Sequence, residues 1–123
     1  MLRAEIPRGT RIFLPVMAAK KRRLEERLLT VFFRWGFQEI VTPSFEYMDV
    51  FTLGLGAAYQ EQLFKLEERR TGRLLALRPD ITTQIARLSA TWLKERPRPL
   101  RFCYVADIFR HNDSQTRNTQ ELY

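Results

Sequence analysis

The chain has 123 residues, of which 45% are hydrophobic and 28% are charged. This composition suits one folded domain and excludes a disordered or low-complexity protein. No stretch reaches the roughly 18 apolar residues that a membrane-spanning helix requires, and the N-terminus lacks the apolar run of a signal peptide. The net charge is +7: residues 1–35 carry +6, residues 36–70 carry −3 and residues 71–123 carry +4. With only one cysteine, the chain is predicted to be cytoplasmic and independent of membranes.

The basic N-terminal third has two interpretations. A basic surface favours polyanions such as RNA or nucleotides. A solvated helix face explains the same charges, and an acidic remainder of the protein would balance them. We prefer the solvated face, because the aromatic residues between 31 and 37 follow the apolar side of the same segment instead of alternating with the basic residues.

The first predicted element is a long helix that begins near Pro15, where a proline is best tolerated, and ends with Gly36 as its C-cap. An apolar stripe at helical spacing is predicted to face inward, and residues 20–23 are predicted to face solvent. A short strand over residues 38–41 follows, and Pro43 ends it because proline cannot donate to a strand ladder. The stripe consists of Leu24, Leu28, Val31 and Trp35, widened by Leu29, Phe32 and Phe33.

Residues 44–52 are predicted to form a short helix, followed by a loop over residues 54–56. Residues 63–66 and 73–77 are typical of two strands of a hairpin, because the connection between them is charged and ends in a glycine. The short helix is predicted to turn Phe45, Met48 and Phe51 inward.

A second amphipathic helix follows, with Asp80 as its predicted N-cap. Residues 97–99 form a rigid connector, residues 100–110 a strand and residues 111–119 a polar loop before a return strand. This order predicts an α+β fold with a mostly antiparallel sheet flanked by helices. The inward face of the second helix is predicted from Ile81, Ile85, Leu88 and Trp92, and the strand is predicted to bury the Cys103 thiol.

Four stretches in order resemble the histidyl-tRNA synthetase family of class II aminoacyl-tRNA synthetases. The resemblance covers nearly the whole chain and implies the N-terminal portion of that catalytic core, with motif 1 at about 15–43 and motif 2 at about 100–123. It also implies a homodimer through residues 15–43, with the rest of the core and any C-terminal domain beyond Tyr123. The stretches are Arg8-Gly9-Thr10-Arg11-Ile12-Phe13-Leu14-Pro15, Gly36-Phe37-Gln38-Glu39-Ile40-Val41-Thr42-Pro43, Leu77-Arg78-Pro79-Asp80-Ile81-Thr82 and Tyr104–Arg110.

This resemblance implies an amino-acid pocket in which Asp80 receives the ammonium group, Thr82 is a hydroxyl partner and Arg110 bridges the amino acid and ATP. From the residues alone, Asp80 can also act only as a helix cap. Arg110 can hold a carboxylate or a phosphate in a bidentate pair, or lie in a surface salt bridge. The lone His111 provides neither a metal site nor a catalytic triad, so no catalytic residue, cofactor or metal is expected.

The segment after Arg110 departs from the synthetases at the positions that bind ATP. Asn112 stands where the family has glutamate, Asp113 stands where it has arginine, and residues 118–120 contain no arginine. Adenylate formation depends on preorganised positive charge, and loss of one preorganised donor costs about 3–4 kcal/mol in a comparable enzyme. We therefore expect a retained amino-acid pocket beside a damaged ATP site.

A retained pocket without an ATP site resembles the paralogous regulatory subunits of ATP phosphoribosyltransferase, which share the segment at residues 78–87. That resemblance implies a non-catalytic subunit in the first step of histidine biosynthesis, partnered by a short-form catalytic subunit, with histidine as feedback effector. We do not expect tRNA binding. The alternatives are a histidyl-tRNA synthetase, which activates histidine with ATP and charges tRNA, and a basic RNA-binding module.

Overall fold

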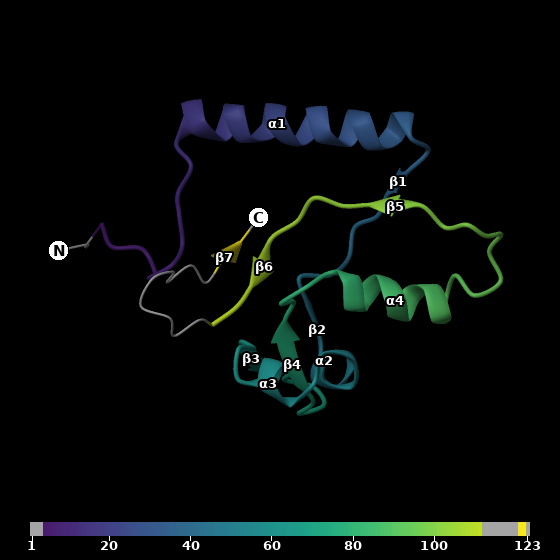
Figure 1. The fold of residues 1–123 in the computed structure, drawn as a ribbon. Helices are drawn as coiled ribbons and strands as arrows, with labels where there is room; N and C mark the ends of the chain where they lie inside the picture. Colours follow the sequence, from purple (N-terminus) through teal and green to yellow (C-terminus); the bar gives the residue numbers. More distant parts are fainter. Residues whose placement is uncertain (1–3, 112–120, 123) are drawn as a thin grey trace.

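The computed structural model describes residues 4–111 and 121–122, and within these ranges no helix is long and apolar enough to cross a membrane. The predicted α+β fold is confirmed (Figure 1). The helices are α1 (Pro15–Arg34), α2 (Met48–Leu55), α3 (Ala57–Gln60) and α4 (Thr82–Ala90). The strands are β1 (Gln38–Glu39), β2 (Phe45–Tyr47), β3 (Lys65–Glu67), β4 (Leu74–Leu77), β5 (Phe102–Cys103), β6 (Ile108–Phe109) and β7 (Glu121–Leu122).

Three small sheets organise the described chain. The largest is antiparallel with the order β2-β4-β3, and its register places Phe45 opposite Leu77 and Leu66 opposite Leu75. The predicted hairpin is therefore confirmed, with its first strand shifted toward the C-terminus. Strands β6 and β7 also pair antiparallel, as expected for a return strand, whereas β1 and β5 pair in parallel.

The hydrophobic core lies where α2 packs against the three-stranded sheet. Phe51 of α2, Leu63 and Ala76 of β4 are buried together, and Met48 and Leu55 pack against them. The predicted inward positions of Met48 and Phe51 are thus confirmed. Burying a phenylalanine side chain contributes roughly 1.5–3 kcal/mol, so this cluster anchors the module formed by α2, α3, α4 and the sheet β2-β4-β3.

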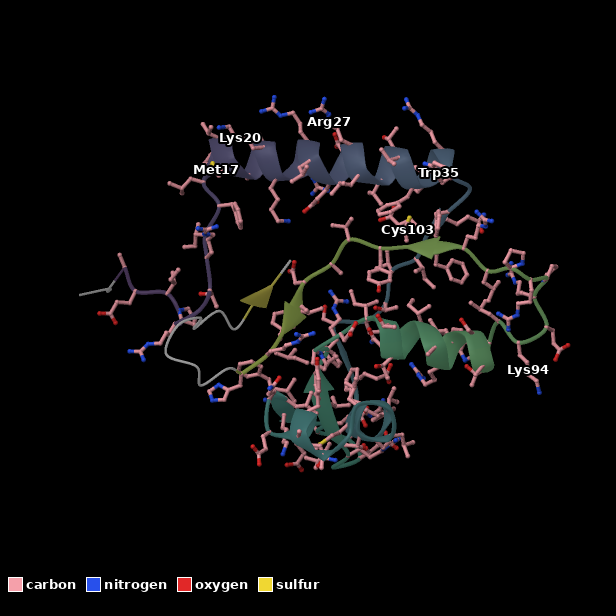
Figure 2. The ribbon with its side chains drawn as sticks, viewed as in Figure 1. Met17, Lys20, Arg27, Trp35, Lys94 and Cys103 are labelled. Atoms are coloured by element: carbon pink, nitrogen blue, oxygen red, sulfur yellow. The ribbon has the colours of Figure 1, made fainter. Side chains whose placement is uncertain are left out.

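Helix α1 begins at Pro15 as predicted and ends at Arg34, so the C-cap is Trp35 and not Gly36. Gly36 follows directly, with the positive φ of +80° that favours glycine just beyond a helix end. The predicted burial of its apolar stripe is wrong within the described chain: no residue of α1 is buried, and Trp35 is 71% exposed. Figure 1 shows α1 along one edge of the molecule, apart from the module around α2 and α4. Figure 2 shows Lys20 and Arg27 extending away from the strands. Lys21, which was also predicted to face solvent, is instead partly buried, pairs with Glu25 and lines a cavity.

The segment predicted as a helix over residues 44–52 begins instead as a strand. Residues 45–47 pair with β4, so Phe45 is exposed while Glu46 is buried, and the helix starts only at Met48. Pairing with a central strand overrides local helical preference. The predicted loop over residues 54–56 is also corrected, because α2 continues to Leu55 and only Gly56, at φ +76°, breaks the chain before α3.

Two expectations for the C-terminal half are corrected as well. Helix α4 ends at Ala90, so Trp92 falls beyond it and is 86% exposed instead of facing inward. The strand predicted over residues 100–110 is two short strands, β5 and β6, because the segment pairs first with β1 and then with β7. Ile81 and Cys103 are buried, as predicted.

Candidate functional site

The segment between β4 and α4 is fixed by a buried arginine. Arg78 donates from Nε to the carbonyl oxygen of Asp107 at 2.6 Å and from Nη1 to that of Thr42 at 2.9 Å, while its backbone N–H donates to the Ser44 carbonyl. Burial lowers the pKa of Arg78, and the nearby Asp107 carboxylate opposes this shift. A guanidinium remains charged at neutral pH even so, and it ties together three segments that are distant in the sequence.

A second buried contact fixes α4. Gln84 is almost fully buried; its Nε2 donates to the Pro43 carbonyl at 3.0 Å, and its Oε1 accepts from the Thr42 hydroxyl at 2.8 Å. Arg87, one turn further along α4, forms an ion pair with the buried carboxylate of Glu46. The residues that end the motif 1 segment therefore position the helix that follows the predicted ligand-binding segment.

Asp80 lies just before α4, where its carboxylate meets the start of the helix. Its Oδ1 accepts the backbone N–H of Thr82 at 2.9 Å, while Ile81 occupies the N-cap position itself. The prediction of Asp80 as the N-cap is therefore wrong by one residue, although its carboxylate still accepts a backbone N–H of the first turn. This hydrogen bond fixes the orientation of the Asp80 carboxylate at the start of the helix.

Thr82 is the first residue of α4 and is exposed. Its hydroxyl lies 3.3 Å from the Tyr104 hydroxyl, so the two groups share a hydrogen bond. Tyr104 begins the fourth motif stretch, but its contact with Thr82 was not predicted, because residues 104–107 lie between β5 and β6 and outside any strand.

Arg110 follows β6 and points back to the segment that carries Asp80. Its Nε donates to the Pro79 carbonyl at 2.9 Å, and its Cζ lies 5.6 Å from the centre of the Tyr59 ring. The Phe109 N–H donates to the Arg78 carbonyl at 2.9 Å, which holds this strand end against the β4–α4 connection. The structure therefore brings Asp80, Thr82 and Arg110 to the same connection. Tyr59 had no sequence signal, because its proximity to Arg110 depends on the placement of α3.

A cavity of about 310 Å³ lies between α1 and this connection. The cavity borders the candidate site through two of its lining residues. Ile81 precedes Thr82 in the sequence, and Tyr104 shares a hydrogen bond with Thr82. Its polar wall includes the Lys21–Glu25 ion pair of α1 and Arg78. The full lining is Lys21, Glu25, Ile40, Val41, Thr42, Ser44, Arg78, Ile81, Tyr104, Val105, Ala106 and Asp107.

Three features bear on the expectation that the chain has no catalytic residue and no metal. The Cys103 thiol is buried, and burial, with the Glu39 charge as a smaller cause, raises its pKa, so this thiol is poorly suited to act as a nucleophile. Within residues 4–111 and 121–122, no group of three metal-ligating side chains is present. Asn112, Asp113 and residues 118–120 lie outside the described residues, so the damaged ATP site stays a prediction from the sequence.

Comparison with known proteins identifies the class. Residues 9–123 match the histidyl-tRNA synthetase family, and the chain belongs to this family, with a class II synthetase-like fold. Within it, the chain is 43% identical over 119 residues to the ATP phosphoribosyltransferase regulatory subunit of Syntrophotalea carbinolica, covering 97% of this chain and 28% of that one. It is 38% identical to the histidine–tRNA ligase of Methanoculleus marisnigri, covering 95% of this chain and 28% of that protein.

A solved structure gives the same answer. The Bacillus halodurans structure described as an ATP phosphoribosyltransferase regulatory subunit/histidyl-tRNA synthetase superposes with a TM-score of 0.79 at 35% identity, covering 96% of this chain and 30% of that one. The chain thus spans less than a third of the length of these relatives.

Proposed function

We propose that this chain is part of a regulatory subunit of ATP phosphoribosyltransferase, acting in the first step of histidine biosynthesis in the cytoplasm. Its partner is a short-form catalytic subunit of that enzyme, and histidine is the effector. Two facts together carry the proposal: the similarity to proteins of that name, and the placement of Asp80, Thr82 and Arg110 around one connection.

The proposed histidine site uses opposite charges at its two ends. Asp80 accepts the ammonium group of the amino acid, and the Thr82 hydroxyl provides a second acceptor beside it. Arg110 binds the carboxylate, because a guanidinium matches a carboxylate in planar, two-bonded geometry. The Pro79 carbonyl accepts from the Nε of Arg110 at 2.9 Å, which ties the guanidinium to the residue that precedes Asp80.

The proposed subunit has no catalytic activity of its own. Adenylation requires preorganised positive charge along the triphosphate, and the sequence places Asn112 and Asp113 where the synthetases have glutamate and arginine. An acidic side chain at that position repels a polyphosphate. The site is accordingly proposed to bind the amino acid alone.

The proposed subunit is a homodimer through residues 15–43. The support is the apolar face of α1, whose Leu24, Leu28, Val31 and Trp35 are each about half or more exposed in the described chain. An apolar stripe of this length is a recurrent feature of subunit interfaces. Val31→Glu is expected to convert the dimer to a monomer in sedimentation experiments. Arg22→Ala removes one positive charge from the opposite side of the helix and is expected to leave the dimer intact; dissociation by both variants would refute this interface.

The function is tested by calorimetric titration of the complete natural protein with histidine and then with ATP. Histidine binding without ATP binding is expected. Asp80→Asn separates the charge of this side chain from its structural role, because the amide Oδ1 can still accept the Thr82 N–H while the charge is lost. We expect histidine binding to weaken by about 10–100-fold, as for loss of a charge-assisted hydrogen bond. The control Asp49→Asn, at an exposed carboxylate of α2, is expected to bind normally.

A histidyl-tRNA synthetase is the second candidate, favoured by the 38% identity to the ligase of Methanoculleus marisnigri. The two functions differ in one measurement, the histidine-dependent exchange of pyrophosphate into ATP. Exchange at a synthetase-like rate would replace the regulatory proposal with the ligase. Absence of exchange, with histidine bound, supports the regulatory subunit.

A further inference from the structure

The placement of α3 brings an aromatic ring to Arg110. Gly56 adopts φ +76° and ψ 170°, which turns the chain between α2 and α3. After α3, the Gln62 carbonyl accepts the backbone N–H of His111 at 2.9 Å, and the Gln62 N–H donates to the Tyr59 carbonyl. The chain that carries Tyr59 is therefore hydrogen-bonded directly to the residue that follows Arg110.

Two contacts orient the guanidinium of Arg110. The Tyr59 ring centre lies 5.6 Å from Cζ, within the roughly 6 Å over which a cation is attracted to a ring face. Nε donates to the Pro79 carbonyl, and this is the only hydrogen bond of the guanidinium within residues 4–111. Both Nη atoms thus remain available, and they form the edge that pairs with a planar anion.

We propose that Tyr59 is a positioning residue, which holds the guanidinium of Arg110 so that its Nη edge receives the carboxylate of an amino-acid ligand. Tyr59 acts through Arg110 and does not bind the ligand itself. The inference rests on the proposed histidine site and adds a residue to it. An arginine suits this contact better than a lysine, since a lysine lacks the flat surface that stacks on a ring.

The test is a calorimetric double-mutant cycle on the complete natural protein, with histidine and with histamine, which lacks the carboxylate. Tyr59→Leu is expected to weaken histidine binding by about 3–10-fold, the size of a partly exposed cation–π contact. Tyr59→Phe keeps the ring and is expected to stay within about twofold of the parent. Histamine binding is expected to be unchanged by either variant. In an Arg110→Ala background, Tyr59→Leu is expected to have no further effect.

The outcomes separate this inference from the proposed function. Equal weakening of histidine and histamine, or effects of Tyr59→Leu and Arg110→Ala that simply multiply, would show that Tyr59 only packs α3 and would overturn the inference while leaving the histidine site intact. A parent protein that binds no histidine would overturn the proposed function, and this inference with it. Thermal unfolding of Tyr59→Leu and Tyr59→Phe verifies that both variants fold.

Discussion

Helices α1 and α2 differ in the burial of their apolar residues. Helix α2 has eight residues and buries Phe51 almost completely against β4, whereas α1 has twenty residues and buries none. Burial of apolar surface is the main favourable term in folding, so the α2 module holds itself together while α1 does not. The exposed apolar side chains of α1 are the surface on which the proposed homodimer rests.

The largest expected effect lies in the module of α2. Phe51→Ala is expected to lower the free energy of unfolding by about 3–5 kcal/mol, through lost burial and the cavity left behind. The control is Leu53→Ala, on the same helix, where the side chain is 90% exposed. This variant is expected to change the free energy of unfolding by less than about 0.5 kcal/mol. Urea denaturation measures both. An equal loss at Leu53 would break the comparison, because α2 would then have a second covered face.

The next largest effect tests how Arg78, just after β4, joins the α2 module to the segments that contain Thr42 and Asp107. Arg78→Met keeps a long side chain but leaves the Thr42 and Asp107 carbonyls without their donor, and we expect a loss of about 2–3 kcal/mol. Arg73→Met is the matched control, since Arg73 stacks on Tyr47 and pairs with Asp49 near solvent. Exposed ion pairs contribute at most about 1 kcal/mol. If the two variants unfold at the same urea concentration, the hydrogen bonds of Arg78 to Thr42 and Asp107 do not stabilise the fold.

A smaller effect depends on pH. Burial raises the pKa of Cys103 above its ordinary value of 9.0, so the unfolded chain ionises its thiol before the folded chain does. Ionisation of the thiol therefore has no effect on stability below about pH 8. As pH rises through 9, it lowers the free energy of unfolding by up to about 1.4 kcal/mol per pH unit. Cys103→Ala is expected to flatten the loss of stability between pH 8 and 10. Parallel pH profiles for the two proteins would show that the thiol is accessible to water when folded.

The smallest effect is expected in α1. Val31→Ala is expected to leave the monomer as stable or to stabilise it by about 0.5 kcal/mol, because alanine has the higher helix propensity and little burial is lost. At concentrations where sedimentation reports the dimer, the same substitution is expected to weaken association. A clear loss of stability in the monomer would show that the face of α1 is already covered within one subunit.

The sequence alone determined the elements whose signals are local. Pro15 marks the start of α1, and Gly36 lies just beyond its C-cap Trp35. The charged turn that ends in Gly72 marks the β3–β4 hairpin, and the order of motifs indicated the family. It also identified Asp80, Thr82 and Arg110 as one set, and the structure places them around one connection. Their role as ligands to histidine stays a prediction.

Only the tertiary structure decided the features that depend on distant neighbours. Residues 45–47 form a strand because β4 is available to pair with them. The α1 stripe stays exposed because, apart from the Phe37 ring against Phe32, little of the described chain packs on it. Tyr59 reaches Arg110 because a backbone hydrogen bond between Gln62 and His111 joins two segments about 50 residues apart. Periodicity reports which face of an element is apolar, but the partner of that face is set by contacts that no local pattern encodes.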